Sequence, residues 1–302
     1  MKVPGLPRTA LAALIGLAPL AAPAPAAESA QQGTGGPTAE DAAAARYFGI
    51  YDEPITLTAG AYEGEAFVEG GASRPMVGLI DRLQFIADMD GDGRGERVVF
   101  LWENSGGSGT NMYLARVHLD GEATAVFLGN RVHVRGVTPM DGELLLALLR
   151  PGEEDAMCCP GELALQLWAA EGRGLTLTND ETEGRLGLAA LAGEWEWRPS
   201  AAMLRDDVPF YPATIRVEED GSLSGDAPCN YLSGALVFEE PNVLRAAPIA
   251  ATQRACEFPI LAAEDYFLSR LQAVDGVGWN MGRLALSYTF EEEYGFLLFA
   301  RR

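Results

Sequence analysis

Three aspartates at alternate positions form the clearest metal-binding pattern in the sequence. The stretch "ADMDGDGRGE" places Asp88, Asp90 and Asp92 ahead of a glycine. Carboxylates with this spacing open the calcium loop of helix–loop–helix proteins, which closes with a bidentate glutamate at its twelfth position. The twelfth residue here is Val99. Either another residue closes a calcium site, or the stretch is only an acidic turn.

The segments around this loop have the pattern of β-strands. Apolar runs of strand length flank it, "LQFIA" before and "VVFLWE" after. Ten such runs follow one another with no helical period between them, and the Asp-Gly pairs in 119–122 and 140–143 indicate hairpin turns. This spacing predicts an all-β meander or sandwich over residues 46–180.

A second block follows the polar stretch 179–187 and occupies residues 188–302. Residues 261–274 are predicted to form its one helix, with Glu264 and Arg270 on the solvent side. Apolar runs of strand character surround this helix. We therefore predict a mainly β chain of two domains, in which the second is an antiparallel β domain with one packed helix.

The first 26 residues have the features of a secretory signal peptide. A short basic region precedes an apolar run, and the small residues that follow fit cleavage after Ala26. The uninterrupted apolar run is shorter than the roughly 20 residues needed to span a bilayer, and no cysteine near this end could carry a lipid. We expect a periplasmic or secreted protein without stable membrane insertion, in which residues 27–45 form a flexible leader.

The charge balance argues against nucleic acid as a partner. The formal net charge is −21, and it becomes −23 when Lys2 and Arg8 leave with the signal peptide. A chain this acidic repels nucleic acid and attracts divalent cations. Its histidines, His118 and His133, each lie among apolar strand residues, which argues against a histidine-based triad or a His-rich metal centre.

Residues 103–111, "ENSGGSGTN", also invite a catalytic interpretation. They lack the G-x-S-x-G order of a nucleophile elbow. They also lack the Lys-Ser/Thr pair of a phosphate-binding loop. We interpret them as a flexible loop between strands, and the alternative is an exported hydrolase that uses a carboxylate together with this loop.

Four cysteines, Cys158, Cys159, Cys229 and Cys256, form an even set in a chain expected to reach an oxidising compartment. Disulfides are therefore expected, and three connectivities are open. Adjacent Cα atoms lie only about 3.8 Å apart across a trans peptide, below the roughly 4.4 Å of relaxed disulfides. A bridge between Cys158 and Cys159 would be strained.

The second block resembles a known family. "GDAPCNYLSGALVF" and "PIAATQRACEFP" are followed by the predicted helix, by "LALSYTF" and by "FLLFAR". This order is similar to the META domain of HslJ-like bacterial envelope proteins over residues 188–302. The resemblance implies a compact antiparallel sheet with one packed helix, a link to envelope stress tolerance and no established catalytic activity.

This resemblance also implies roles for polar and cysteine residues of the second block. Cys229 and Cys256 occupy family positions, and we expect them to bond to each other. Asn230 and Thr252 are expected to satisfy the loop backbone beside that disulfide. In the alternative, Asn230, Thr252 and Arg254 line a ligand groove.

That pairing leaves Cys158 and Cys159 as partners for each other. We interpret a vicinal bridge there as a rigid turn clasp. Because strained disulfides on loops have higher reduction potentials, a thiol–disulfide sensor at Cys158 and Cys159 is the alternative.

The first block resembles an uncharacterised domain of exported proteobacterial proteins, in the order "LTAGAY", the acidic stretch, "LGNRVHV" and "CCP". Its acidic loop is similar to the loops of FG-GAP-type repeats, which close with an acid at the ninth position. The ninth residue here is Glu96. The resemblance implies a calcium cage with carboxylates from Asp88, Asp90, Asp92 and Glu96 and the carbonyl oxygen of Arg94, in which the ion has a structural role.

Taken together, these features predict a non-catalytic exported protein of the bacterial envelope with a binding or structural role. Structural Ca²⁺ is the cofactor that the sequence indicates. The sequence names no partner, although an envelope protein or a small-molecule ligand fits a binding role.

Overall fold

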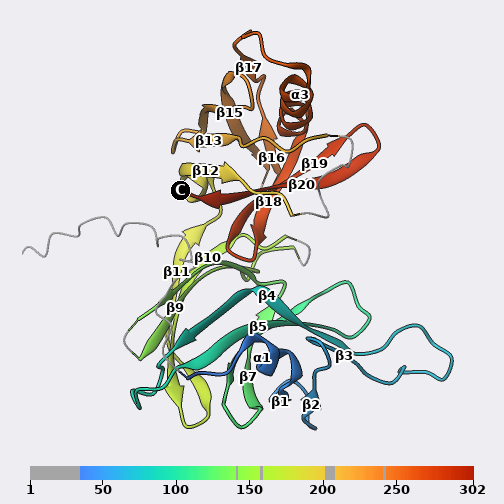
Figure 1. Cartoon of the computed structure of the whole chain (residues 1–302), viewed down its shortest axis with the longest axis vertical. Coiled ribbons are helices and arrows are strands. Elements are labelled where there is room, and N and C mark those ends of the chain that lie inside the picture. Colours follow the sequence, from blue (N-terminus) through green and yellow to red (C-terminus); the bar gives the residue numbers. More distant parts are fainter. Residues whose placement is uncertain (1–34, 141, 157–158, 201–207, 241–242) are drawn as a thin grey trace, which may run out of the picture.

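The structure is a computed structural model that describes residues 35–140, 142–156, 159–200, 208–240 and 243–302. Within them the chain forms twenty strands and three helices (Figure 1), and the predicted mainly β fold is confirmed. The predicted signal peptide, residues 1–26, and the first part of the predicted leader lie outside the described residues. No helix in the described part of the chain is long and apolar enough to cross a membrane.

A seven-stranded sheet with the order β2-β1-β7-β6-β5-β4-β3 begins the fold. Its strands are β1 Arg46–Phe48, β2 Ile55–Thr56, β3 Ala61–Glu63, β4 Met76–Ala87, β5 Glu96–Asn104, β6 Asn111–Val117 and β7 Glu122–Asn130. On β5, Val98 and Phe100 face one core while Val99 and Leu101 face another. Successive strand residues point to opposite faces, so this continuous apolar run marks a strand covered on both sides.

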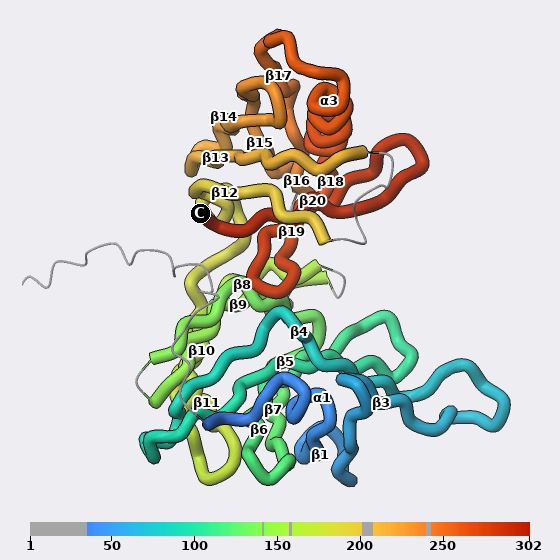
Figure 2. The backbone as a smooth tube through the Cα atoms, in the orientation of Figure 1, coloured from blue at the N-terminus to red at the C-terminus, as the bar shows by residue number. Residues whose placement is uncertain are grey.

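A four-stranded sheet with the order β11-β10-β9-β8 packs over one face of the first. Its strands are β8 His133–Pro139, β9 Glu143–Arg150, β10 Glu162–Glu171 and β11 Gly174–Arg185. The polar stretch 179–187, expected to interrupt the strand pattern, instead continues β11 along β10 as far as Arg185. β11 lies at the edge of its sheet, where exposed polar side chains are well tolerated. In Figure 2 this strand leads toward the C-terminal half.

The other face of the first sheet is covered by α1, Ala39–Ala44. A Thr38–Asp41 capping box starts this helix. Ala42 and Ala45 are buried against the sheet. The prediction of a flexible leader over 27–45 is therefore wrong for residues 39–45, because a short capped helix with small buried side chains fits there.

A third sheet, of nine strands, forms the C-terminal half, with the order β16-β15-β14-β13-β12-β20-β19-β18 and β17 paired to β15. Its strands are β12 Gly193–Trp197, β13 Thr214–Val217, β14 Ser222–Asp226, β15 Tyr231–Glu240, β16 Val243–Ala246, β17 Ala250–Ala251, β18 Val274–Asn280, β19 Arg283–Phe290 and β20 Glu293–Arg301. The end strands β16 and β18 contact each other, so the sheet curls around its core. The short helix α2, Leu188–Leu191, precedes β12.

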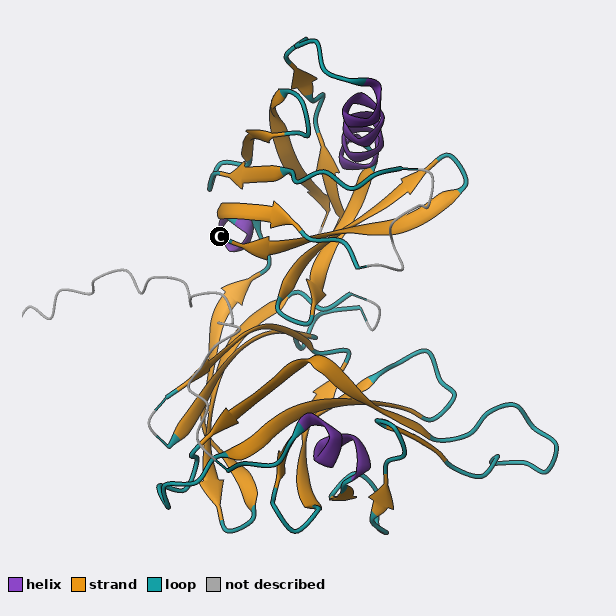
Figure 3. Ribbon diagram, viewed as in Figure 1, coloured by secondary structure: helices purple, strands orange, loops and turns teal. Residues whose placement is uncertain are grey.

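One long helix, α3, packs on this sheet (Figure 3). It spans Phe258–Gln272, whereas the sequence predicted 261–274. Its earlier start follows from Pro259, because a proline in the first turn loses no helical hydrogen bond. Phe267 and Leu271 bury the apolar side of the helix in the core.

The two halves of the chain share contacts. Leu149 and Leu163, from β9 and β10, belong to the core of the C-terminal half. The tip of the β18–β19 hairpin reaches β8, where the Gly282 backbone N–H donates to the Val134 carbonyl at 2.9 Å. The division into domains 46–180 and 188–302 stays a prediction.

Candidate functional site

The acidic loop joins β4 to β5 and brings three of its predicted ligands together. Carboxylate oxygens of Asp88, Asp90 and Glu96 lie within 4.8 Å of one another. Asp92 is not in this group, and its carboxylate accepts the Arg94 backbone N–H at 2.8 Å. The ninth-position glutamate thus lies beside the first two aspartates, as a calcium cage requires, whereas Asp92 forms a local turn.

Backbone hydrogen bonds fix the shape of this loop. Asp88 accepts the N–H groups of Gly91 and Gly93 at 2.8 and 3.0 Å. Both glycines have left-handed backbone, with φ of 74° and 85°, which other residues adopt only at a cost. Glu96 is buried and accepts the Met89 N–H at 3.0 Å. The carboxylates are therefore positioned by the loop itself.

A buried arginine that the sequence did not reveal lies against these carboxylates. Arg116 of β6 is fully buried, and its guanidinium pairs with Asp90 and, at 3.2 Å, with Glu96. It also donates to the Gly172 carbonyl at 2.9 Å, while its Nε has no hydrogen-bond partner. The only signal in the sequence is a charged residue inside the apolar run of β6.

The donor set fits a hard divalent cation. Three carboxylates face one guanidinium, so Asp88, Asp90 and Glu96 keep an excess of negative charge. All three offer oxygen, the ligand that calcium prefers. Arg116 competes for part of this oxygen surface, and a bound ion must share Asp90 and Glu96 with it.

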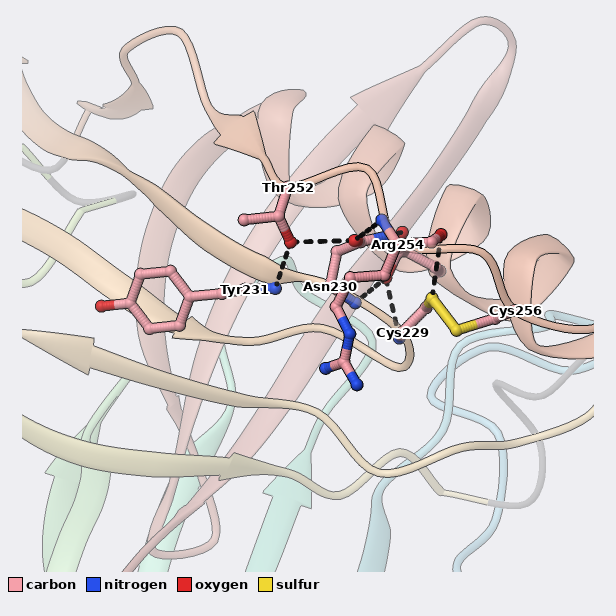
Figure 4. Close-up of a disulfide and its surroundings, with 7 residues drawn as sticks. Cys229, Asn230, Tyr231, Thr252, Arg254 and Cys256 are labelled. Carbon is pink, nitrogen blue, oxygen red and sulfur yellow. Dashed lines mark hydrogen bonds between the residues drawn. A yellow bond between two sulfur atoms is a disulfide. The ribbon is translucent and has the colours of Figure 1, made fainter.

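The structure contains the predicted Cys229–Cys256 disulfide, with Cα atoms 6.2 Å apart (Figure 4). Cys159 is also disulfide-bonded. Cys158 lies outside the described residues, so the vicinal pairing of Cys158 with Cys159 stays a prediction.

Beside the Cys229–Cys256 disulfide, Asn230 links two loops (Figure 4). Its side-chain oxygen accepts the Thr252 hydroxyl at 2.8 Å and the Arg254 N–H at 2.7 Å. Its amide nitrogen donates to Glu264 at 2.6 Å. Asn230 is buried, whereas Thr252 and Arg254 are exposed. This geometry favours a structural role for Asn230 over a ligand groove formed by the three residues.

Glu264 of α3 completes this network and corrects a sequence prediction. It is buried rather than solvent-exposed, and it accepts the N–H groups of Cys229 and Asn230 at 2.8 and 2.6 Å. Arg270, also predicted on the solvent side, is buried against the Tyr266 ring and paired with Glu293. Both charges are buried because each finds a partner there, which helical periodicity alone does not indicate.

The glycine- and serine-rich loop 103–111 begins at a further buried carboxylate, that of Glu103. Glu103 accepts hydrogen bonds from the Tyr51 hydroxyl at 3.1 Å, from the Asn111 amide at 2.6 Å and from the Ser105 hydroxyl. Burial and the charge of Glu103 raise the pKa of Tyr51 above its usual value. Three donors already converge on Glu103, which suits an anchor for the loop better than a base for Ser105.

The histidines are engaged away from this loop. His118 contacts the Arg173 carbonyl oxygen at 2.9 Å, and His133 contacts the Trp279 carbonyl oxygen at 2.7 Å. Because a carbonyl oxygen only accepts, each histidine donates its proton there. The structure does not bring either histidine to Ser105.

Comparisons with known proteins identify a family for the C-terminal part of the chain. A search of curated proteins and a search of solved structures each found no match. The model of the META domain family matches residues 189–301, which lie within the range expected from the resemblance. Residues 189–301 of this chain, which run from α2 to β20, form a META domain.

Proposed function

We propose that this chain is a non-catalytic exported protein of the bacterial envelope with a binding or structural role that supports envelope integrity under stress. The observation that carries the proposal is the network of Asn230 and Glu264 beside the Cys229–Cys256 disulfide, in which the polar groups serve the domain's own loops. A disulfide of this kind suits an oxidising compartment. The META match adds support for the link to the envelope.

Deleting the gene from its host should increase sensitivity to envelope stress, such as heat with detergent, and the full-length chain should restore tolerance. Mass spectrometry of the periplasmic fraction should give a mature chain beginning at Ala27, because cleavage is expected after Ala26. A chain without residues 1–26 is the matched control and should not restore tolerance. Rescue by this control, or an intact Met1 on the exported protein, would contradict the proposal.

Calcium is the proposed structural ion of the loop between β4 and β5. It would hold Asp88, Asp90 and Glu96 together and offset their excess negative charge. The convergence of these three side chains supports this part of the proposal.

Calcium should raise the thermal midpoint of the protein, as measured by circular dichroism. At a free concentration of about 100 times the dissociation constant, the gain is roughly 2.7 kcal/mol. Asp88→Asn should remove the response, because it removes a charged ligand while leaving both partners of Arg116. Asp92→Asn is the matched control and should keep the response, because Asp92 lies outside the cluster. Equal calcium shifts in the wild type and in Asp88→Asn would show general charge screening instead.

An exported hydrolase is the second candidate, because Ser105 and Glu103 do lie in contact. A panel of ester, peptide and glycoside substrates separates the candidates. Turnover lost in Ser105→Ala would support the hydrolase, and activity absent in the wild type would support the binding or structural role.

A further inference from the structure

A groove of about 420 Å³ lies where the META domain meets the first half of the chain. This volume is within the range of pockets for small molecules, roughly 300 to 1,000 Å³. Its lining includes His133, Cys159, Gly278, Ser287, Tyr294 and Phe296. None of these residues belongs to the acidic loop or to the Cys229–Cys256 network.

The β18–β19 hairpin positions the floor of the groove. Met281 and Gly282 form its two-residue turn with positive φ at both positions, 52° and 77°, as tight hairpins require. The hairpin is held on β8 by the Gly282–Val134 hydrogen bond and by His133, whose Nδ1 donates to the Trp279 carbonyl at 2.7 Å. Both halves of the chain therefore fix the same cleft.

Small residues form the floor, and aromatic rings stand beside it. Gly278 pairs with Ala285, and Ser287 pairs with Phe296 across the neighbouring strand. Directly opposite residues share a face of the sheet, and Tyr294 lies two positions from Phe296 on that face. The Tyr294 and Phe296 rings contact each other at 5.4 Å between centroids, and they remain 65% and 38% exposed. Their ring faces are thus available to a ligand.

Cys159 and Pro160, from the first half of the chain, form another part of the groove wall. Asp155 closes the loop that carries them, because its carboxylate accepts the N–H groups of Gly152 and Gly161 at 2.7 and 2.8 Å. A hydrogen bond from Arg185 lowers the pKa of the Asp155 carboxyl, so the clamp is charged at neutral pH. The wall is therefore tied to β11, which carries Arg185.

The polar groups along the groove offer acceptors. Ser287 donates its proton to Asp275 at 2.7 Å, which leaves its oxygen lone pairs for a ligand. Asp275 also accepts the Thr289 hydroxyl at 2.6 Å, so two hydroxyl groups converge on this carboxylate next to Ser287. Because His133 donates through Nδ1, neutral His133 has an accepting Nε2. The described lining holds neither lysine nor arginine.

We propose that this groove binds a small ligand in which a protonated amine is attached to an apolar or aromatic group. Aromatic faces attract cations, and acceptors beside a carboxylate match the N–H donors of an ammonium group. Gly278 has no side chain, which leaves room beside the His133 ring for the apolar part of the ligand. Because the groove shares no residue with the calcium loop or the disulfide network, failure here leaves the function proposed above untouched.

Isothermal titration calorimetry at pH 7 with three matched probes tests the charge. Phenethylamine, 2-phenylethanol and 3-phenylpropionate carry the same ring with a cation, a neutral hydroxyl and an anion. Phenethylamine should bind about tenfold more tightly than the alcohol, and the acid should bind least. Equal binding of the three, stronger binding of the acid, or no binding of the amine would overturn the proposal.

Variants of the full chain test the location. Tyr294→Ala/Phe296→Ala removes exposed rings and should weaken amine binding about tenfold. Gly278→Leu should place a side chain in the groove and abolish binding. The fold should tolerate the change, because an added Cβ would meet only the His133 ring, at 3.7 Å. Phe67→Ala removes an exposed ring from the loop between β3 and β4 and should leave binding unchanged. Unchanged amine affinity in the double variant and in Gly278→Leu, with wild-type thermal midpoints, would place binding elsewhere and overturn the proposal.

Discussion

Replacing Arg116 with methionine is expected to lower the free energy of unfolding by about 3 to 5 kcal/mol, the usual cost of removing one partner of a buried ion pair. Arg116 is fully buried, and Glu96 is nearly so. The variant leaves the carboxylates of Asp90 and Glu96 close together without their internal cation. Denaturant unfolding in the presence of a chelator measures the loss.

Calcium should restore more stability to Arg116→Met than it adds to the wild type, because the ion no longer competes with a guanidinium. Arg173→Met is the matched control. Arg173 pairs with Asp120 where both side chains are about half exposed, and such a surface pair contributes roughly 0 to 1 kcal/mol. Equal losses of unfolding free energy in Arg116→Met and Arg173→Met would show that the buried ion pair stabilises the fold no more than the surface pair does.

The double variant Cys229→Ala/Cys256→Ala should lose about 3 to 4 kcal/mol, because the disulfide closes a 27-residue separation and restricts the unfolded chain. The loss should appear in denaturant unfolding of the oxidised protein. Reduction of the wild type should reproduce most of it.

Glu264→Gln separates this chain-entropy effect from the hydrogen bonds beside it. The substitution keeps the shape of Glu264 but weakens its bonds to Cys229 and Asn230, with an expected cost of about 1 to 3 kcal/mol. The Cys158→Ala/Cys159→Ala variant is the control, since a vicinal bridge restricts little chain. If this control lost more unfolding free energy than the Cys229→Ala/Cys256→Ala variant, the stabilisation assigned to the Cys229–Cys256 disulfide would be contradicted.

The strands could be predicted because their signals are local. Alternation and apolar runs located β5, and the Asp-Gly pair in 119–122 located the turn before β7, where Gly121 has a φ of 83°. The loop ligands Asp88, Asp90 and Glu96 also come from one short stretch, so their spacing was informative. Local spacing still could not separate Asp92, whose carboxylate forms its own turn.

Long-range partners could not be predicted in the same way. Arg116 lies 26 residues from Asp90, and Glu264 lies 34 residues from Asn230. A charged residue in an apolar strand or on a helix is normally expected to face solvent. Only the folded chain shows which carboxylate or backbone N–H is its buried partner. The same limit hid the groove, whose walls come from both halves of the chain.

The shared contacts between the halves also determine how the protein comes apart. Leu149 and Leu163 complete the META core, and the β18–β19 tip is hydrogen-bonded to β8. Opening either half would expose apolar side chains of the other, so we expect the two halves to melt together in one transition. A META fragment cut after β11 would lack Leu149 and Leu163, so part of its core would be exposed to solvent.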